Sequence, residues 1–123
     1  MTLTLQGTVS GSAAATAMCQ SVGSLTVGNS PGIQIGGETV QLQLVLDQFH
    51  GPGAYAPDVT QSLWTESSGG GIDVKFAFTS AQMSTVTSTA GSGSFDGDFT
   101  GDKYNDPNKP VSEHLHATWS CPG

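Results

Sequence analysis

Two histidines near the end of the chain, His114 and His116, have the spacing of a metal-binding pair. On a β-strand, residues two apart leave the same face, so the two imidazoles would lie side by side, opposite Leu115 and Trp119. Imidazole is a ligand for Zn²⁺ and Cu²⁺, and His50, which ends another alternating segment, is the candidate for a third ligand. The alternative is that His114 and His116 are ordinary exposed residues of a strand.

Carboxylates gather in the segment that precedes these histidines. Asp96, Asp98 and Asp102 lie close together in the sequence, and Ca²⁺ prefers such oxygen ligands. The segment does not fit an EF-hand loop, because Pro107 stands where a bidentate Glu is required and no flanking helix is predicted. A looser calcium site at a strand end stays open. Its alternative is solvated turn residues, with Asp96 and Asp98 on an exposed strand face.

Three aromatic residues, Tyr55, Trp64 and Tyr104, lie in or beside predicted loops. Exposed rings at such positions stack on sugar rings or enter a pocket of a protein partner. The alternative is that they cover the ends of the core. No catalytic group is predicted, since the G-x-S-x-G match at residues 28–32 contains Pro31, which has no N–H for an oxyanion hole.

Alternating apolar and polar residues predict the strands that must position these side chains. In the longest run, residues 39–55, four apolar side chains at positions 40, 42, 44 and 46 share one face, which is typical of a half-buried strand. Gly51-Pro52-Gly53 ends this strand. Further short strands are expected at 2–9, 12–19, 24–27, 33–35, 62–66, 72–78, 83–89, 94–100 and 111–121. Gly- and Pro-rich turns separate them, as at 51–60.

This spacing predicts one domain, residues 1–123, folded as an antiparallel, Ig-like β-sandwich of about eight strands with one disulfide. A small β-barrel is the alternative. The chain has 123 residues and a net charge of −7, with three lysines and no arginine. It therefore lacks the cations that displace counterions from nucleic acid, and we exclude nucleic acid as a partner. No run of 18 apolar residues predicts a transmembrane segment.

Two cysteines, Cys19 and Cys121, bracket most of the chain. A disulfide between them would close a loop of about 100 residues and stabilise the fold by about 4–5 kcal/mol at most. Two buried thiols in a reducing compartment are the alternative. The opening MTLTLQGTV has no basic start and no apolar stretch of a signal peptide, which fits a cytosolic protein or the mature form of an exported one. The cysteines favour the exported form.

Three short motifs resemble a pattern in small secreted proteins and lipoproteins of Gram-positive, actinobacterial-type bacteria. They are Phe49-His50-Gly51-Pro52-Gly53-Ala54-Tyr55, Gly93-Ser94-Phe95-Asp96-Gly97-Asp98-Phe99 and Thr118-Trp119-Ser120-Cys121. The resemblance covers roughly residues 19–121. It implies an extracytoplasmic β-sandwich closed by a Cys19–Cys121 disulfide. It implies no activity, because such domains are mostly without assigned function.

We therefore expect an acidic, non-catalytic binding or structural module that is secreted or held at the cell surface. Its partner would be a protein, a carbohydrate or further copies of the chain. No cofactor is expected unless zinc or calcium binds at the residues described above. The alternatives are a metal-binding protein that uses His50, His114 and His116, and a small β-barrel that binds an apolar ligand, with or without catalysis.

Overall fold

The chain folds almost entirely into antiparallel strands, as the alternation predicts. The structure is a computed structural model and describes residues 1–29, 32–56, 63–66, 72–78 and 84–121. The strands in these ranges are β1 (Thr2–Gly7), β2 (Gly11–Ala14), β3 (Ala17–Val22), β4 (Ser24–Asn29), β5 (Ile33–Ile35), β6 (Glu38–Asp47), β7 (Gly53–Tyr55), β8 (Leu63–Glu66), β9 (Ile72–Phe78), β10 (Ser84–Val86), β11 (Gly93–Asp102) and β12 (Pro110–Trp119). A 3-10 turn, η1 (Lys103–Asn105), precedes β12.

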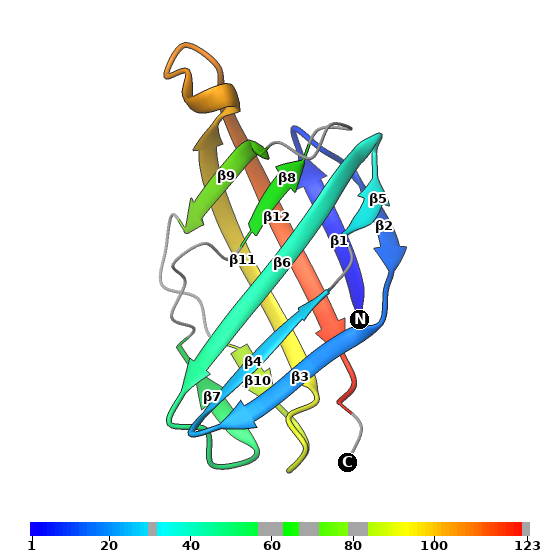
Figure 1. Ribbon diagram of the computed structural model, residues 1–123, viewed down its shortest axis with the longest axis vertical. Helices are drawn as coiled ribbons and strands as arrows, with labels where there is room; N and C mark the ends of the chain where they lie inside the picture. Colours follow the sequence, from blue (N-terminus) through cyan, green and yellow to red (C-terminus); the bar gives the residue numbers. More distant parts are fainter. Residues whose placement is uncertain (30–31, 57–62, 67–71, 79–83, 122–123) are drawn as a thin grey trace.

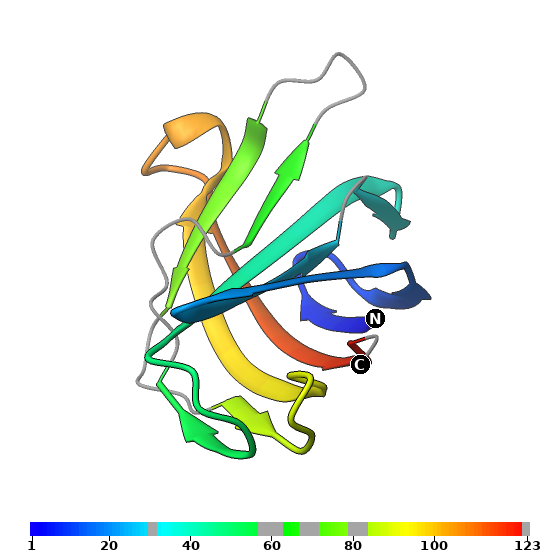
Figure 2. The same cartoon turned by 60° about the horizontal axis from the view of Figure 1, so that its bottom comes forward.

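Two antiparallel layers pack face to face in a β-sandwich (Figures 1 and 2). One layer contains β2, β1, β12 and β11, to which β10 and β7 are added. The other contains β3, β4, β6, β5, β8 and β9. A short ladder between β9 and β11 joins the layers on one side. On the other side no ladder joins β2 to β3, so the predicted sandwich is confirmed and the alternative, a closed barrel, is not formed.

Strand β6 changes partners along its length. Its second half, from Gln43 to Asp47, pairs with β4, whereas residues 39–42 pair with β8 on the opposite edge. Where β4 departs, the buried side chain of Asn29 takes its place. The Asn29 Nδ2 donates to the Val40 carbonyl at 3.0 Å, and its Oδ1 accepts from the Leu42 N–H at 2.8 Å. The Val40 carbonyl and the Leu42 N–H therefore stay satisfied inside the protein.

The core lies between the layers and is built from the inward-facing positions of both. Its largest fully buried side chains are Leu3, Leu5, Leu25, Val27, Val40, Leu42, Leu44, Leu46, Leu63, Phe95, Phe99 and Leu115. The predicted inward face of β6 and the predicted outward direction of Asp96 and Asp98 on β11 are both confirmed. Period-two alternation was therefore a sufficient guide to the core-facing residues.

Two local expectations are corrected. The segment 12–19, expected as one strand, forms parts of β2 and β3, because the chain leaves β1 after Ala14 and crosses to the other layer. The segment 51–60, expected as a loop, contains β7, which pairs with β10. Strands β2 and β7 have only four and three residues and lack the long apolar alternation of β6, β11 and β12.

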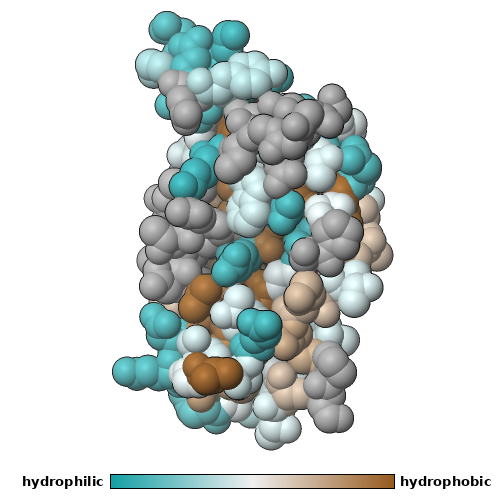
Figure 3. Space-filling model, viewed as in Figure 1, coloured by the Kyte–Doolittle hydropathy of each residue, from teal (hydrophilic) through white to brown (hydrophobic). Residues whose placement is uncertain are grey.

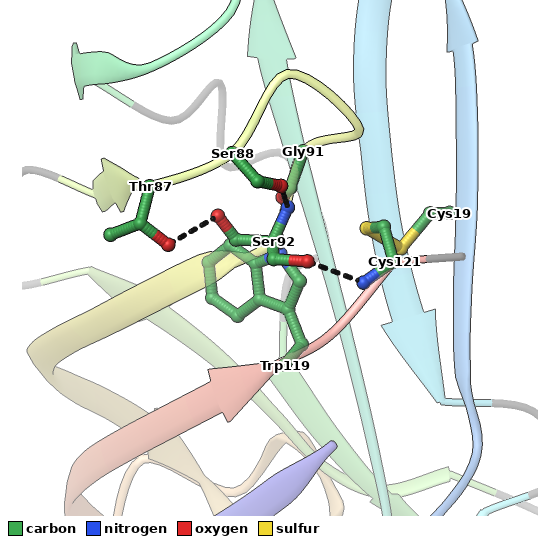
Figure 4. Close-up of a disulfide and its surroundings, with 7 residues drawn as sticks. All are labelled: Cys19, Thr87, Ser88, Gly91, Ser92, Trp119 and Cys121. Atoms are coloured by element: carbon green, nitrogen blue, oxygen red, sulfur yellow. Dashed lines mark hydrogen bonds between the residues drawn. A yellow bond between two sulfur atoms is a disulfide. The ribbon is translucent and has the colours of Figure 1, made fainter. Parts of the chain in front are cut away.

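The predicted disulfide forms between Cys19 on β3 and Cys121 just after β12, with a Cα–Cα distance of 5.8 Å. It links the two layers on the side where β2 and β3 do not pair (Figure 4). The β10–β11 connection is tied to the same place. The Cys121 N–H donates to the Ser92 hydroxyl and the Trp119 indole N–H donates to the Gly91 carbonyl, each at 2.7 Å. The disulfide therefore closes the sandwich where no backbone ladder does.

We predict that replacing both Cys19 and Cys121 by Ser lowers the free energy of unfolding by about 2–5 kcal/mol, because the loop closed by the bond spans 102 residues. Urea unfolding with and without reductant measures the change. Reductant should lower the wild-type midpoint and leave the double variant unchanged. A wild-type midpoint that does not respond to reductant would contradict the stabilising role.

Candidate functional site

Strands β11 and β12 bring two histidines and two aspartates together on the outer face of their layer. In the register, Asp98 lies opposite His114 and Asp96 lies opposite His116. The His114 Nδ1 is 2.6 Å from the Asp98 Oδ1, and its Nε2 contacts Asp96. The His116 Nδ1 is 3.4 Å from the second oxygen of Asp96. Sequence analysis placed each pair on one face of its strand, but only the cross-strand register joins the two pairs in one cluster.

This cluster favours a protonated His114, because both ring nitrogens face carboxylate oxygens and only the imidazolium donates from both. The hydrogen bond to Asp98 raises the pKa of His114 above its ordinary value of 6.5. Desolvation opposes this effect, and the charges of Asp96 and Asp98 reinforce it. An imidazolium has no lone pair for a metal, so the geometry is that of ion pairs rather than of a coordination site.

The other predicted metal ligands lie elsewhere. His50 follows β6, and its Nδ1 is 3.0 Å from the Gln48 carbonyl and 3.1 Å from the Tyr55 hydroxyl. Asp102 ends β11 and lines a shallow hollow of about 640 Å³ with Lys75 and residues of β11 and β12. Within the described ranges, no three His, Cys, Asp or Glu side chains form a group that could hold a metal ion. Zinc and calcium binding stay predictions without support from this geometry.

One of the three predicted aromatic binding residues, Tyr55, is placed differently from expectation. Tyr55 is buried, and its hydroxyl donates to the Gly51 carbonyl at 2.7 Å and accepts from the His50 N–H at 3.0 Å. It covers one end of the core, so its role as an exposed binding residue is corrected. Tyr104 on η1 is exposed, with the ammonium groups of Lys103 and Lys109 at 5.4 and 5.8 Å from its ring centre.

The third aromatic, Trp64, lies on β8 and lines a groove of about 350 Å³ on the outer face of its layer. Its side chain is partly exposed. The other side chains along the groove come from β3, β4 and β6 and are Met18, Gln20, Thr26, Gln41 and Gln43. Figure 3 looks onto this face and shows hydrophilic side chains interspersed with apolar ones. The volume of the groove is within the range of about 300–1,000 Å³ that is usual for small-ligand sites.

A buried carboxylate was not singled out from the sequence. Glu113 faces inward from β12 and is only 3% exposed. One of its oxygens accepts from the Val9 N–H, and the other, Oε2, has no hydrogen-bond partner among the residues that the structure describes. Burial raises the pKa of Glu113, and the hydrogen bond from Val9 lowers it in part. Its inward parity, shared with Leu115, was the available signal.

We predict that Asp98→Asn lowers the pKa of His114, because it removes the main interaction that raises it. NMR titration of the imidazole ring protons measures this change, and Asp102→Asn is the matched control. The ion pairs of protonated His114 stabilise the fold fully below pH 6.5, and this stabilisation is lost as the pH rises through the folded-state pKa of His114. For these exposed pairs it should be at most about 1 kcal/mol. An unchanged His114 pKa in Asp98→Asn would contradict the ion-pair cluster.

We predict that Glu113→Gln increases the stability of the protein relative to wild type as the pH rises above 4.5. The raised pKa means that the unfolded chain ionises first, so wild-type stability falls between the unfolded-state and folded-state pKa values of Glu113. The amide stays neutral throughout, and its gain at pH 7 should be about 1 kcal/mol. Urea unfolding at pH 4 and at pH 8 tests this. A variant that loses stability relative to wild type over that range would contradict it.

Comparison with protein-family models, with curated proteins and with solved structures finds no match to this chain. The resemblance to small secreted and lipoprotein-type domains therefore stays a prediction.

Proposed function

We propose that this chain is a non-catalytic binding module that acts outside the cytoplasm, secreted or at the cell surface. The observation that carries the proposal is the groove beside Trp64. It combines a partly exposed indole with several polar side chains on a rigid sheet face. Sites on strands hold such groups more precisely than sites on loops. A protein or a carbohydrate is the class of partner proposed for this groove.

The disulfide supports the location. Disulfides persist in oxidising compartments and are rare in the cytosol, and both cysteines of the chain are used in this bond. None of the helical structure in the described ranges is long and apolar enough to cross a bilayer. The net charge of −7 argues further against a nucleic-acid partner.

The titratable groups support binding over catalysis. A general base needs a free lone pair within reach of a substrate proton, and both nitrogens of His114 are directed at carboxylates. Glu113 is buried beneath the sheet, where one oxygen already accepts from Val9. No thiol is free to act as a nucleophile. The His114 cluster instead places ion pairs on the outer face of the β11–β12 layer.

Chemical-shift mapping with a library of small sugars and short peptides tests the proposal. We predict that ligands shift the backbone amides of Gln20 and Gln43 and the indole N–H of Trp64. The amides of η1 and the buried Trp119 indole should stay unchanged. Trp64→Ala should lose these responses, whereas Tyr104→Ala, the matched exposed aromatic, should keep them. Responses that gather around Tyr104 or His114 instead would contradict the choice of groove.

A further inference from the structure

The groove exists because β6 exchanges partners in the middle of its layer. The β4–β6 ladder ends at the pair Gly28–Gln43, and the β6–β8 ladder begins on the opposite edge at Leu42. The backbones of β4 and β6 separate there, and the side chain of Asn29 on β4 reaches across to the backbone of β6. The floor of the groove is therefore made of well-bonded, buried groups at Asn29 and Leu42.

Glycine at position 28 keeps this space open. Met18, Gly28 and Gln43 are cross-strand neighbours in one row, and the middle position of that row has no side chain. A Cβ at position 28 would lie 2.9 Å from the Leu42 carbonyl oxygen, so no larger residue fits without displacing β6. The row thus has raised ends and a depressed centre.

The described side chains that line the groove are uncharged. Gln20 and Gln43 present exposed carboxamides, and Gln41 contributes a third that is half-buried. Each carboxamide both donates and accepts hydrogen bonds, as the hydroxyl of Thr26 also does. No charged side chain lines the groove among the residues that the structure describes. Lys75, the cross-strand neighbour of Trp64, lies outside it.

We propose that this groove binds an uncharged carbohydrate chain. The inference rests on the proposed function and names the ligand class of that same site. The indole of Trp64 offers an apolar face for a sugar ring, and the exposed carboxamides of Gln20 and Gln43 offer paired donors and acceptors to neighbouring hydroxyl groups. The groove is open at the surface, so a longer glycan can enter it with a short segment and extend beyond it.

Other ligand classes fit the lining less well. A purely apolar ligand would cover the carboxamides of Gln20 and Gln43 and leave their hydrogen bonds unmade. An acidic glycan would meet a chain of net charge −7 with no cation in the groove. An extended peptide needs a free sheet edge for its backbone. On the edge of β6 where β4 departs, the Asn29 side chain already occupies the Val40 carbonyl and the Leu42 N–H.

Isothermal titration of the full chain with neutral hexasaccharides of glucose, xylose and mannose tests the proposal. At least one should bind and shift the Trp64 indole N–H. Trp64→Ala should weaken that binding about tenfold or more, and Gln20→Ala and Gln43→Ala about threefold to tenfold each. The glutamine variants change exposed positions, so they keep the test valid if Trp64→Ala fails to fold. Tyr104→Ala is the matched control and should stay within about twofold of wild type.

A galacturonate hexasaccharide and uncharged hexapeptides form the comparison ligands. Binding of the acidic glycan as tight as that of the neutral ones would overturn the commitment to an uncharged ligand. If peptides shift the NMR signals of the Gln43 amide and the Trp64 indole N–H while no neutral glycan binds, this inference is overturned and the proposed function is kept. Ligands of all three classes that leave the groove unperturbed would overturn both.

Discussion

The exchange of partners along β6 is the constraint on which both the sandwich and its groove depend. A strand has two hydrogen-bonding edges, and β6 uses them in turn for β4, β5 and β8. The exchange would leave a buried donor at Leu42 and a buried acceptor at Val40, each costing about 1–3 kcal/mol if unpaired. The side chain of Asn29 supplies both partners. This one residue lets the layer divide while the Val40 carbonyl and the Leu42 N–H stay hydrogen-bonded, and the groove lies above it.

Much of the fold could be predicted because the sheet is buried on one face only. Alternation places Leu44 and Leu46 inward and Asp96 outward, since a one-residue slip would expose the whole apolar set. The same rule does not say where a polar strand breaks. The Ala-rich segment 12–19 has no apolar rhythm to mark its crossing at Ala15, and β7 has only three residues. The disulfide could be predicted because two cysteines allow only one pairing.

Less of the candidate site could be predicted, because it depends on which strands are neighbours. The outward direction of Trp64 and Gln43 follows from parity, but their approach across β4, β6 and β8 follows only from strand order. The same limit applies to His114, whose carboxylate partners come from the neighbouring strand. Tyr55 shows the converse, since a tyrosine beside a Gly-Pro turn resembles a surface residue until its hydroxyl is seen bonded to the Gly51 carbonyl.

Amide hydrogen exchange at Leu42 tests the central claim most directly. If the Asn29 side chain completes the ladder of β6, the Leu42 N–H should be as protected as its neighbour Leu44. Its protection should fall in Asn29→Ala more than that of Leu44 does. Exchange of the wild-type Leu42 N–H as fast as that of loop amides, or protection in Asn29→Ala equal to wild type, would contradict the account of how the groove is built.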